Sequence, residues 1–92
     1  MTIVAKYNFK LLFFKVSSCS VCKRQEELLK LYNIPYIPCE LFKNRELARK
    51  YAVTDVPSLV IVDSQNNFIT KYDFLLNRRY AEEILNILQK NQ

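Results

Sequence analysis

The sequence predicts an α/β fold, in which a βαβ unit followed by a ββα unit forms a central mixed sheet of about four strands flanked by helices. Three observations support this prediction. Short runs of branched and aromatic residues alternate with segments of helical periodicity. Capping and turn residues separate these segments. A chain of 92 residues is long enough for one modest core and too short for two, so we expect residues 1–92 to form one domain.

The first unit begins with FKLLFFKV (Phe9–Val16), which is apolar on both faces and therefore typical of a strand buried in the middle of a sheet. Ser17 and Ser18 offer side-chain caps for a helix over about Cys19–Tyr32. The residues expected on the inner face of this helix are Val21, Cys22, Leu28, Leu29 and Tyr32. A short second strand over Tyr36–Pro38 follows, and we expect the right-handed crossover between the two strands.

A second helix is predicted over about Asn44–Ala52, with the asparagine as its cap. SLVIVD (Ser58–Asp63) then predicts a strand, and FITKYDF (Phe68–Phe74) predicts its hairpin partner across a tight turn. A last helix is expected over about Asn77–Lys90, and residues 1–8 can add an edge strand. The inner face of the second helix is expected to carry Leu47, Ala48 and Tyr51. That of the last helix is expected to carry Ala81, Ile84, Leu85 and Leu88.

The chain contains no glycine, so every turn that needs a positive φ must use another residue. Asparagine is the natural substitute, because its short polar side chain tolerates the left-handed region. The asparagines that fall where turns or caps are expected are Asn33, Asn66, Asn67 and Asn77.

Charge and hydropathy exclude several classes of function. The net charge is +5, but the lysines and arginines are scattered from Lys6 to Lys90 among glutamates, so we predict no nucleic-acid binding. The basic surface can steer the protein toward an acidic partner. The longest apolar runs, residues 11–14 and 59–62, are far shorter than the ~20 residues that span a bilayer. Residues 1–10 show no secretion signal, so we expect a cytoplasmic location.

Two cysteines stand three positions apart in SSCSVCKRQEELL, where the first strand gives way to the first helix. A zinc site needs four ligands, whereas the chain has three cysteines and no histidine, so zinc would require Cys39 with a carboxylate or a second chain. A structural disulfide is disfavoured because so short a loop constrains the unfolded chain little. A Cys-x-x-Cys pair beside a βαβ pattern normally indicates a redox motif.

The predicted position of the pair supports redox chemistry. Cys19 would lie at a helix N-terminus, where unpaired N–H groups and the helix dipole stabilise a thiolate, so we expect it to be the attacking nucleophile. Cys22, one turn further along the apolar face, would be the resolving thiol. Lys23 and Arg24 add positive charge that would lower the thiolate pKa further. Ordinary solvation of the helix surface is the alternative explanation for these two cations.

The segments FFKVSSCSVCKRQEELL and YAVTDVPSLVIVD together resemble the thioredoxin superfamily, over about Phe9 to the C-terminus. The resemblance implies that Pro57 follows a cis peptide bond and lies against the cysteines. It also implies that the backbone of Val56 pairs with an extended substrate. A trans proline that starts a strand is the alternative.

Within the superfamily, the sequence has some features that resemble glutaredoxins and others that resemble thioredoxins. The short segment before the cysteines resembles glutaredoxins, whereas NRELARKYAVTDVPSLVIV resembles thioredoxins, with Ala52 in place of their usual glycine. The buried acidic residue of thioredoxins corresponds to Phe13. The glutathione-gripping segment of glutaredoxins corresponds to Thr70 and Lys71, with Asp73 nearby.

The function expected from this resemblance is that of a dithiol-disulfide oxidoreductase, which reduces disulfides in other proteins. Glutathione or a flavoprotein of the thioredoxin reductase type would regenerate it, and we expect no bound cofactor or metal and a monomer. The alternative is a thioredoxin-fold binding module without catalysis, whose cysteines pack or hold a metal between subunits. Cys39 is expected to be a packing residue, with a third redox thiol as its alternative.

Overall fold

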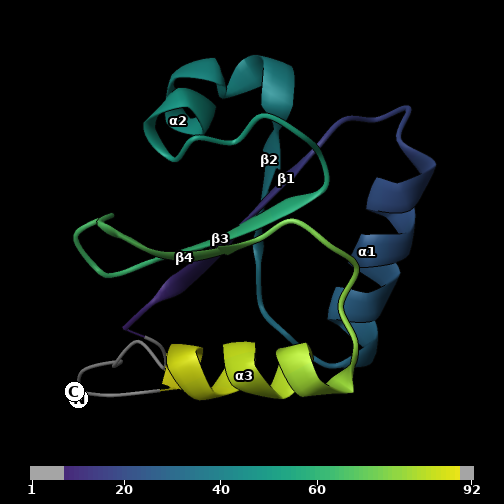
Figure 1. Ribbon diagram of the computed structural model, residues 1–92, viewed down its shortest axis with the longest axis vertical. Coiled ribbons are helices and arrows are strands. Elements are labelled where there is room, and N and C mark those ends of the chain that lie inside the picture. The colour runs from purple at the N-terminus through teal and green to yellow at the C-terminus, as the bar shows by residue number, and fades with distance from the viewer. Residues whose placement is uncertain (1–7, 90–92) are drawn as a thin grey trace, which may run out of the picture.

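Four strands form a mixed sheet in the order β2-β1-β3-β4 in the computed structural model, which describes residues 8–89 (Figure 1). The strands are β1 (Lys10–Lys15), β2 (Ile37–Glu40), β3 (Ser58–Val62) and β4 (Phe68–Tyr72). β1 pairs with β2 in parallel and with β3 antiparallel, and β3 pairs antiparallel with β4. The predicted fold class, a βαβ unit followed by a ββα unit, is therefore confirmed.

Helices cover both faces of this sheet. α1 (Ser20–Leu31) and α3 (Arg78–Gln89) lie on one side of it in Figure 1, and α2 (Arg45–Lys50) lies on the other. A 3₁₀ helix, η1 (Leu41–Lys43), which the sequence pattern did not predict, joins β2 to α2. Within residues 8–89, no helix combines the length and the apolar character that crossing a membrane requires.

The core has two parts because β1 and β3 bury side chains on both faces of the sheet. Phe13 and Phe14 of β1 are both fully buried, and they belong to different clusters. The α1/α3-side core consists of Leu11, Phe13, Cys22, Leu28, Leu29, Ile34, Leu59, Ile61, Tyr72, Leu76, Ala81, Ile84 and Leu88. The α2-side core consists of Leu12, Phe14, Cys39, Ala48, Tyr51, Val53, Val60 and Val62. This arrangement confirms that FKLLFFKV is a strand buried on both sides.

Two helices end in the same way without glycine. After α1, Ile34 N–H donates to the Leu29 carbonyl (2.9 Å) while Asn33 adopts φ 58°. After α2, Val53 N–H donates to the Ala48 carbonyl (2.8 Å) while Ala52 adopts φ 57°. Both are Schellman motifs, which require a left-handed residue just beyond the helix. Asn33 was predicted for such a position, whereas Ala52 was not.

The remaining turn predictions have mixed outcomes. Asn66 adopts φ 67°, and Asn67 closes the β3–β4 turn by donating from its backbone and its side chain to Asp63. Asn77 caps α3 by accepting a hydrogen bond from Tyr80 N–H (3.0 Å). Asn44 does occupy the N-cap position of α2, but its side chain makes no capping hydrogen bond and donates instead to the Glu40 carbonyl (2.8 Å).

Several element boundaries differ from the prediction. β4 ends at Tyr72 rather than Phe74, and β2 lies further along the chain than residues 36–38. Val21, expected on the inner face of α1, is 47% exposed because it lies in the first helical turn on the side away from the core. Leu85 is only half-buried, although it packs against the α1/α3-side core. The edge strand expected over residues 1–8 lies, apart from Asn8, outside the described residues, as does Lys90.

Candidate redox site

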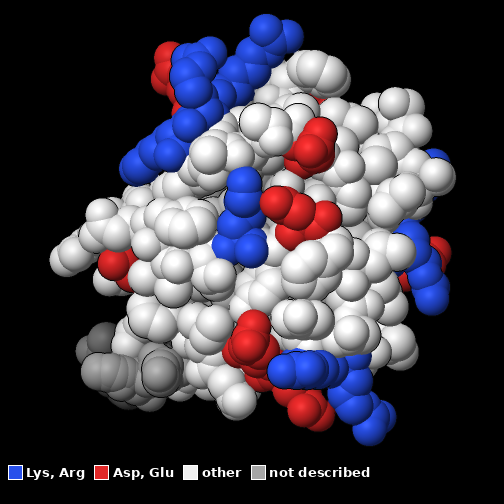
Figure 2. Space-filling model, in the orientation of Figure 1, with Lys and Arg blue, Asp and Glu red and all other residues white. Residues whose placement is uncertain are grey.

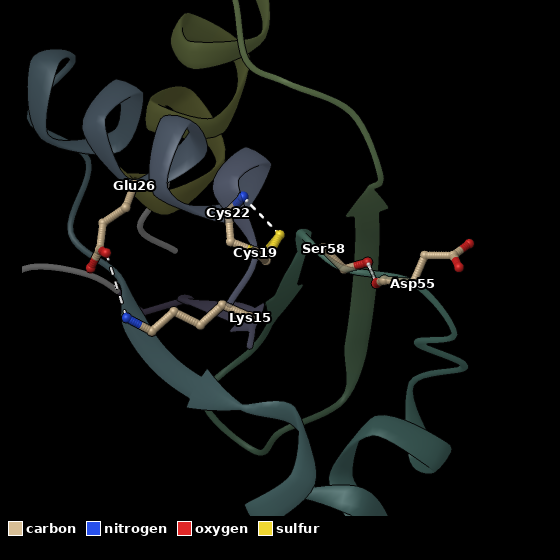
Figure 3. The surroundings of a disulfide bond; sticks show 6 residues. All are labelled: Lys15, Cys19, Cys22, Glu26, Asp55 and Ser58. Carbon is tan, nitrogen blue, oxygen red and sulfur yellow. Dashed lines mark hydrogen bonds and ion pairs between the residues drawn. A yellow bond between two sulfur atoms is a disulfide. The ribbon is translucent and has the colours of Figure 1, made fainter. Parts of the chain in front are cut away.

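Cys19 is the N-cap of α1. Its backbone is extended (φ −93°, ψ 111°), and its Sγ accepts a hydrogen bond of 2.9 Å from the backbone N–H of Cys22 (Figure 3). The prediction that Ser17 and Ser18 cap this helix is therefore wrong. Both serines are exposed and lie in the preceding turn, too early in the chain for their hydroxyl groups to reach the free N–H groups of the first helical turn.

The two cysteines form a disulfide bond, and their Cα atoms are 5.2 Å apart. Cys22 is 2% exposed and belongs to the α1/α3-side core, whereas Cys19 is half-buried. A molecule approaching from solvent therefore meets the sulfur of Cys19 before that of Cys22. The pair also lies at the point predicted from the sequence, where a buried strand leads into a helix.

The cations near the pair are arranged differently from the prediction. Lys23 and Arg24 are both exposed on α1, and Arg24 forms an ion pair with Glu27 (3.3 Å). Lys15, at the end of β1, was not a candidate in the sequence. Figure 3 shows its side chain beneath the cysteine pair in that view and directed toward Glu26, with Nζ 3.5 Å from Oε1 of that residue.

Glu26 is the centre of a small polar network. The hydroxyl of Tyr36 donates a hydrogen bond of 2.6 Å to Oε2 of Glu26. This hydrogen bond, followed by the charge of Lys15, lowers the pKa of Glu26. Burial and the same carboxylate raise the pKa of Tyr36 to about 12. The Tyr36 ring also packs edge-on against Phe13, with ring centroids 5.6 Å apart.

Phe13 is fully buried in β1, at the position where the resemblance places an acidic residue in thioredoxins. This chain therefore has an aromatic side chain there, and the network brings a carboxylate into this region from α1 instead. The sequence offered one signal for Glu26, which is its position four residues after Cys22 and hence on the same side of the helix.

The Val56–Pro57 peptide bond is cis, the isomer that the resemblance implied. Ser58, which follows, is buried, and its hydroxyl donates to the Asp55 carbonyl (2.7 Å) and lies 3.0 Å from Oδ1 of Asp73. Residues 56 and 57 immediately precede β3, which is antiparallel to β1. The start of β3 therefore lies beside the end of β1, from which the chain continues to Cys19. Val56 and Cys19 both pack against the α1/α3-side core.

Thr70, Lys71 and Asp73, which the resemblance to glutaredoxins places near glutathione, have different surroundings in the structure. Lys71 Nζ donates to the Ala52 carbonyl (2.8 Å) and lies 3.8 Å from Oδ2 of Asp73. Asp73 in turn contacts Ser58, so Lys71 and Asp73 brace the segment around Pro57. Thr70 lies one residue earlier in β4 than Lys71, opposite Ile61, and is half-buried.

The sequence reasoning missed Gln25, which is fully buried in α1. Its Nε2 donates to the Phe74 carbonyl (2.9 Å), and its Oε1 accepts from Leu76 N–H (3.0 Å). One side chain thus joins the first helix to the segment between β4 and α3. A polar residue at a position where the helical pattern calls for an apolar one was the only signal of this role.

Cys39 lies apart from the Cys19–Cys22 pair. It is buried in the α2-side core, on the face of the sheet opposite Cys22, and its Sγ lies 3.7 Å from the Ile37 carbonyl. Burial raises the pKa of this thiol. Across residues 8–89, no three histidine, cysteine, aspartate or glutamate side chains are grouped as metal binding would require.

Solved thioredoxins share this fold. A mutant thioredoxin from Halobacterium salinarum superposes with a TM-score of 0.76 at 18% identity, over 94% of this chain and 79% of the other. Thioredoxin from Fasciola hepatica gives a TM-score of 0.69 at 21% identity, over 92% and 84%. Thioredoxin-2 of a malaria parasite, described as a component of protein secretion machinery, gives 0.64 at 25% identity, over 94% and 86%. No protein-family model and no curated protein sequence matches the chain. The chain therefore has the thioredoxin fold, with a Cys-x-x-Cys pair at disulfide distance.

Proposed function

We propose that this protein is a dithiol-disulfide oxidoreductase that reduces disulfide bonds in other proteins through Cys19 and Cys22. The observation that carries the proposal is the hydrogen bond between Cys19 Sγ and Cys22 N–H at the start of α1, in a pair that can form a disulfide. An amide that donates to sulfur stabilises a thiolate over a thiol.

Cys19 is the nucleophile in this proposal. In the reduced protein it lies at the N-terminus of a twelve-residue helix, where free N–H groups and the helix dipole favour negative charge on sulfur. It is also the more exposed cysteine of the pair. Both properties suit a thiol that must attack a disulfide on another protein.

The reaction transfers two electrons in two exchange steps. The Cys19 thiolate attacks one sulfur of the target disulfide, and the other target sulfur leaves as a thiolate. A mixed disulfide then joins Cys19 to the target. Cys22 loses its proton and attacks Cys19 Sγ, which releases the second target sulfur as a thiolate and leaves Cys19 and Cys22 joined. The target thiolates take up protons from solvent.

The segment around Pro57 is the proposed platform for the target chain. Val56 precedes the cis bond and packs against the same core as Cys19, so an extended target segment that pairs with its backbone would hold a disulfide close to Cys19. Ser58, Asp73 and Lys71 keep this segment in place by the contacts described above. They therefore act as positioning residues rather than as residues that react.

A flavoprotein reductase is the regenerating partner that the contacts favour over glutathione. The Lys71 ammonium already contacts a backbone carbonyl and a carboxylate, and Asp73 is shared between Lys71 and Ser58. Both groups therefore already have partners within the protein, which makes them less available to the charged ends of glutathione. A reducing compartment such as the cytoplasm suits this chemistry, because there the disulfide is reduced again after each cycle.

Reduction of insulin by dithiothreitol tests the proposal, with wild type, Cys19→Ser and Cys22→Ser compared. We expect wild type to accelerate the reaction, Cys19→Ser to be inactive, and Cys22→Ser to accumulate a mixed disulfide that mass spectrometry detects. Replacing dithiothreitol by glutathione with glutathione reductase, or by NADPH with thioredoxin reductase, then identifies the reductant. If wild type accelerates none of these reactions, the proposal is wrong.

A further inference from the structure

Four exposed cations cluster at the end of the molecule that η1 and α2 form. They are Lys43, Arg45, Arg49 and Lys50. None of them forms an ion pair with any residue in the range 8–89. Figure 2 shows basic side chains gathered where Figure 1 draws α2. One exposed carboxylate, Glu46, lies among them, and Glu40, just before η1, accepts a hydrogen bond from Phe42 N–H (3.1 Å).

An exposed aromatic ring lies within this cluster. Phe42 is 62% exposed, and the guanidinium of Arg45 lies 5.6 Å from the centre of its ring. Phe42 and Arg45 together line two neighbouring hollows of the surface. Lys43 and Lys50 line the first hollow, and Arg49 lines the second. The surface therefore offers cations on both sides of an apolar contact.

The segment that carries the cluster begins at the end of the sheet where β1 leads to Cys19. β1 and β2 are parallel, and Lys15 is paired with Glu40 in their register. The chain reaches Cys19 shortly after Lys15, and it enters η1 directly after Glu40. Because parallel strands end at the same end of a sheet, a protein that binds over η1 and α2 and extends along this end of the sheet would reach Cys19.

We propose that the surface formed by Phe42, Lys43, Arg45, Arg49 and Lys50 docks an acidic segment of the protein whose disulfide Cys19 attacks. The identity of this partner rests on the proposed function. Carboxylates of the partner contact the arginines, which lie on one side of α2 at positions i and i+4, and an apolar side chain packs on Phe42. The attraction speeds encounter and depends on salt.

A protein partner fits these features better than a nucleic acid. The cations occupy one short segment, with Glu46 among them and Glu40 just before it. Nucleic-acid binding needs a longer basic stripe, and single strands also need several aromatic platforms. A carboxylate-bearing protein segment needs only a local cluster and one apolar contact.

Binding of a fluorescein-labelled peptide rich in glutamate and leucine, followed by anisotropy, tests the surface without requiring catalysis. We expect Arg45→Glu/Arg49→Glu to weaken binding about tenfold at low salt. The matched control is Arg78→Glu/Arg79→Glu, which changes the net charge equally on exposed residues of α3, away from α2 in Figure 1. The control should bind the peptide almost as wild type does. Equal weakening in both variants would overturn the proposal, because net charge alone would then explain it.

Two further measurements complete the test. Single-stranded DNA that binds more tightly than the peptide, and loses binding in Arg45→Glu/Arg49→Glu, would overturn the protein partner in favour of a nucleic acid. In a reduction assay, kcat/KM should fall about tenfold in this variant for a disulfide peptide with an acidic extension, and stay unchanged for a neutral one. Wild type that binds the peptide but reduces no disulfide would overturn the proposed function and leave the docking surface supported.

Discussion

The hydroxyl of Tyr36 donates a hydrogen bond of 2.6 Å to the carboxylate of Glu26, and so ties the chain just before β2 to α1. Lys15 of β1 contacts the other carboxylate oxygen at 3.5 Å. Three separate segments, β1, α1 and the chain before β2, therefore meet at one half-buried carboxylate that lies one helical turn beyond Cys22. The hydrogen bond from Tyr36 and the charge of Lys15 lower the pKa of Glu26. Burial and the Glu26 carboxylate raise the pKa of Tyr36 to about 12.

Removing the carboxylate should destabilise the protein in a manner that depends on pH. We expect Glu26→Gln to lower the free energy of unfolding by about 1.5 kcal/mol at neutral pH, the lower end for a hydrogen bond to a charged group. The folded-state pKa of Glu26 is depressed, so its contribution is present above the ordinary carboxyl pKa and is lost as pH falls through the lowered value. Urea unfolding at neutral and at acid pH measures the difference.

Glu82→Gln is the matched control, because Glu82 is exposed on α3 and forms no ion pair with the described residues. It should change stability little at either pH. A Glu26→Gln variant whose deficit is the same in acid as at neutral pH would contradict the assignment of the effect to the ionised carboxylate. Tyr36 adds a check at high pH, where its stabilising contribution should be lost as pH rises toward about 12.

Gln25 should be more important for stability than any other polar side chain of α1. We expect Gln25→Ala to cost about 3 kcal/mol, because it leaves the Phe74 carbonyl and the Leu76 N–H without their partner and opens a cavity in a buried place. Thermal and urea unfolding measure the loss. Gln65→Ala, in the exposed β3–β4 turn, is the control and should cost almost nothing. Equal losses in both variants would show that the bridge contributes little.

The order of elements and the place of the cysteine pair could be predicted because both depend on local patterns. The apolar residues on both faces of β1 predicted burial on both sides of a sheet, and the cysteine spacing at a strand-to-helix junction predicted the pair. Gln25 could not be predicted, because its partners lie about fifty residues away in the chain and no local pattern specifies them. The left-handed Ala52 was missed because the Schellman position normally selects glycine or asparagine.

Ala52 gives a prediction of increased stability. The left-handed region costs a residue with a Cβ atom, other than asparagine, roughly 1–2 kcal/mol of stability. Glycine avoids this cost, but ordering its more flexible backbone on folding costs about 0.5–1 kcal/mol. We therefore expect Ala52→Gly to raise the free energy of unfolding by about 0.5 kcal/mol. Asn33→Gly, at the equivalent position after α1, is the control and should gain less, because asparagine already tolerates φ 58°. A loss of stability in Ala52→Gly would contradict this argument, and thermal unfolding of both variants decides it.

The three cysteines should differ sharply in reactivity once the protein is reduced. Cys19 accepts an amide hydrogen bond and is half-exposed, whereas Cys39 is buried and its thiol pKa is raised. We expect iodoacetamide to alkylate Cys19 on the order of tenfold faster than either other cysteine at neutral pH. Peptide mapping by mass spectrometry over time measures the three rates. Cys39→Ala should leave the rate at Cys19 unchanged, since Cys39 lies on the opposite face of the sheet. Alkylation of Cys39 as fast as that of Cys19 would show that burial does not protect this thiol, and it would restore Cys39 as a candidate third redox residue.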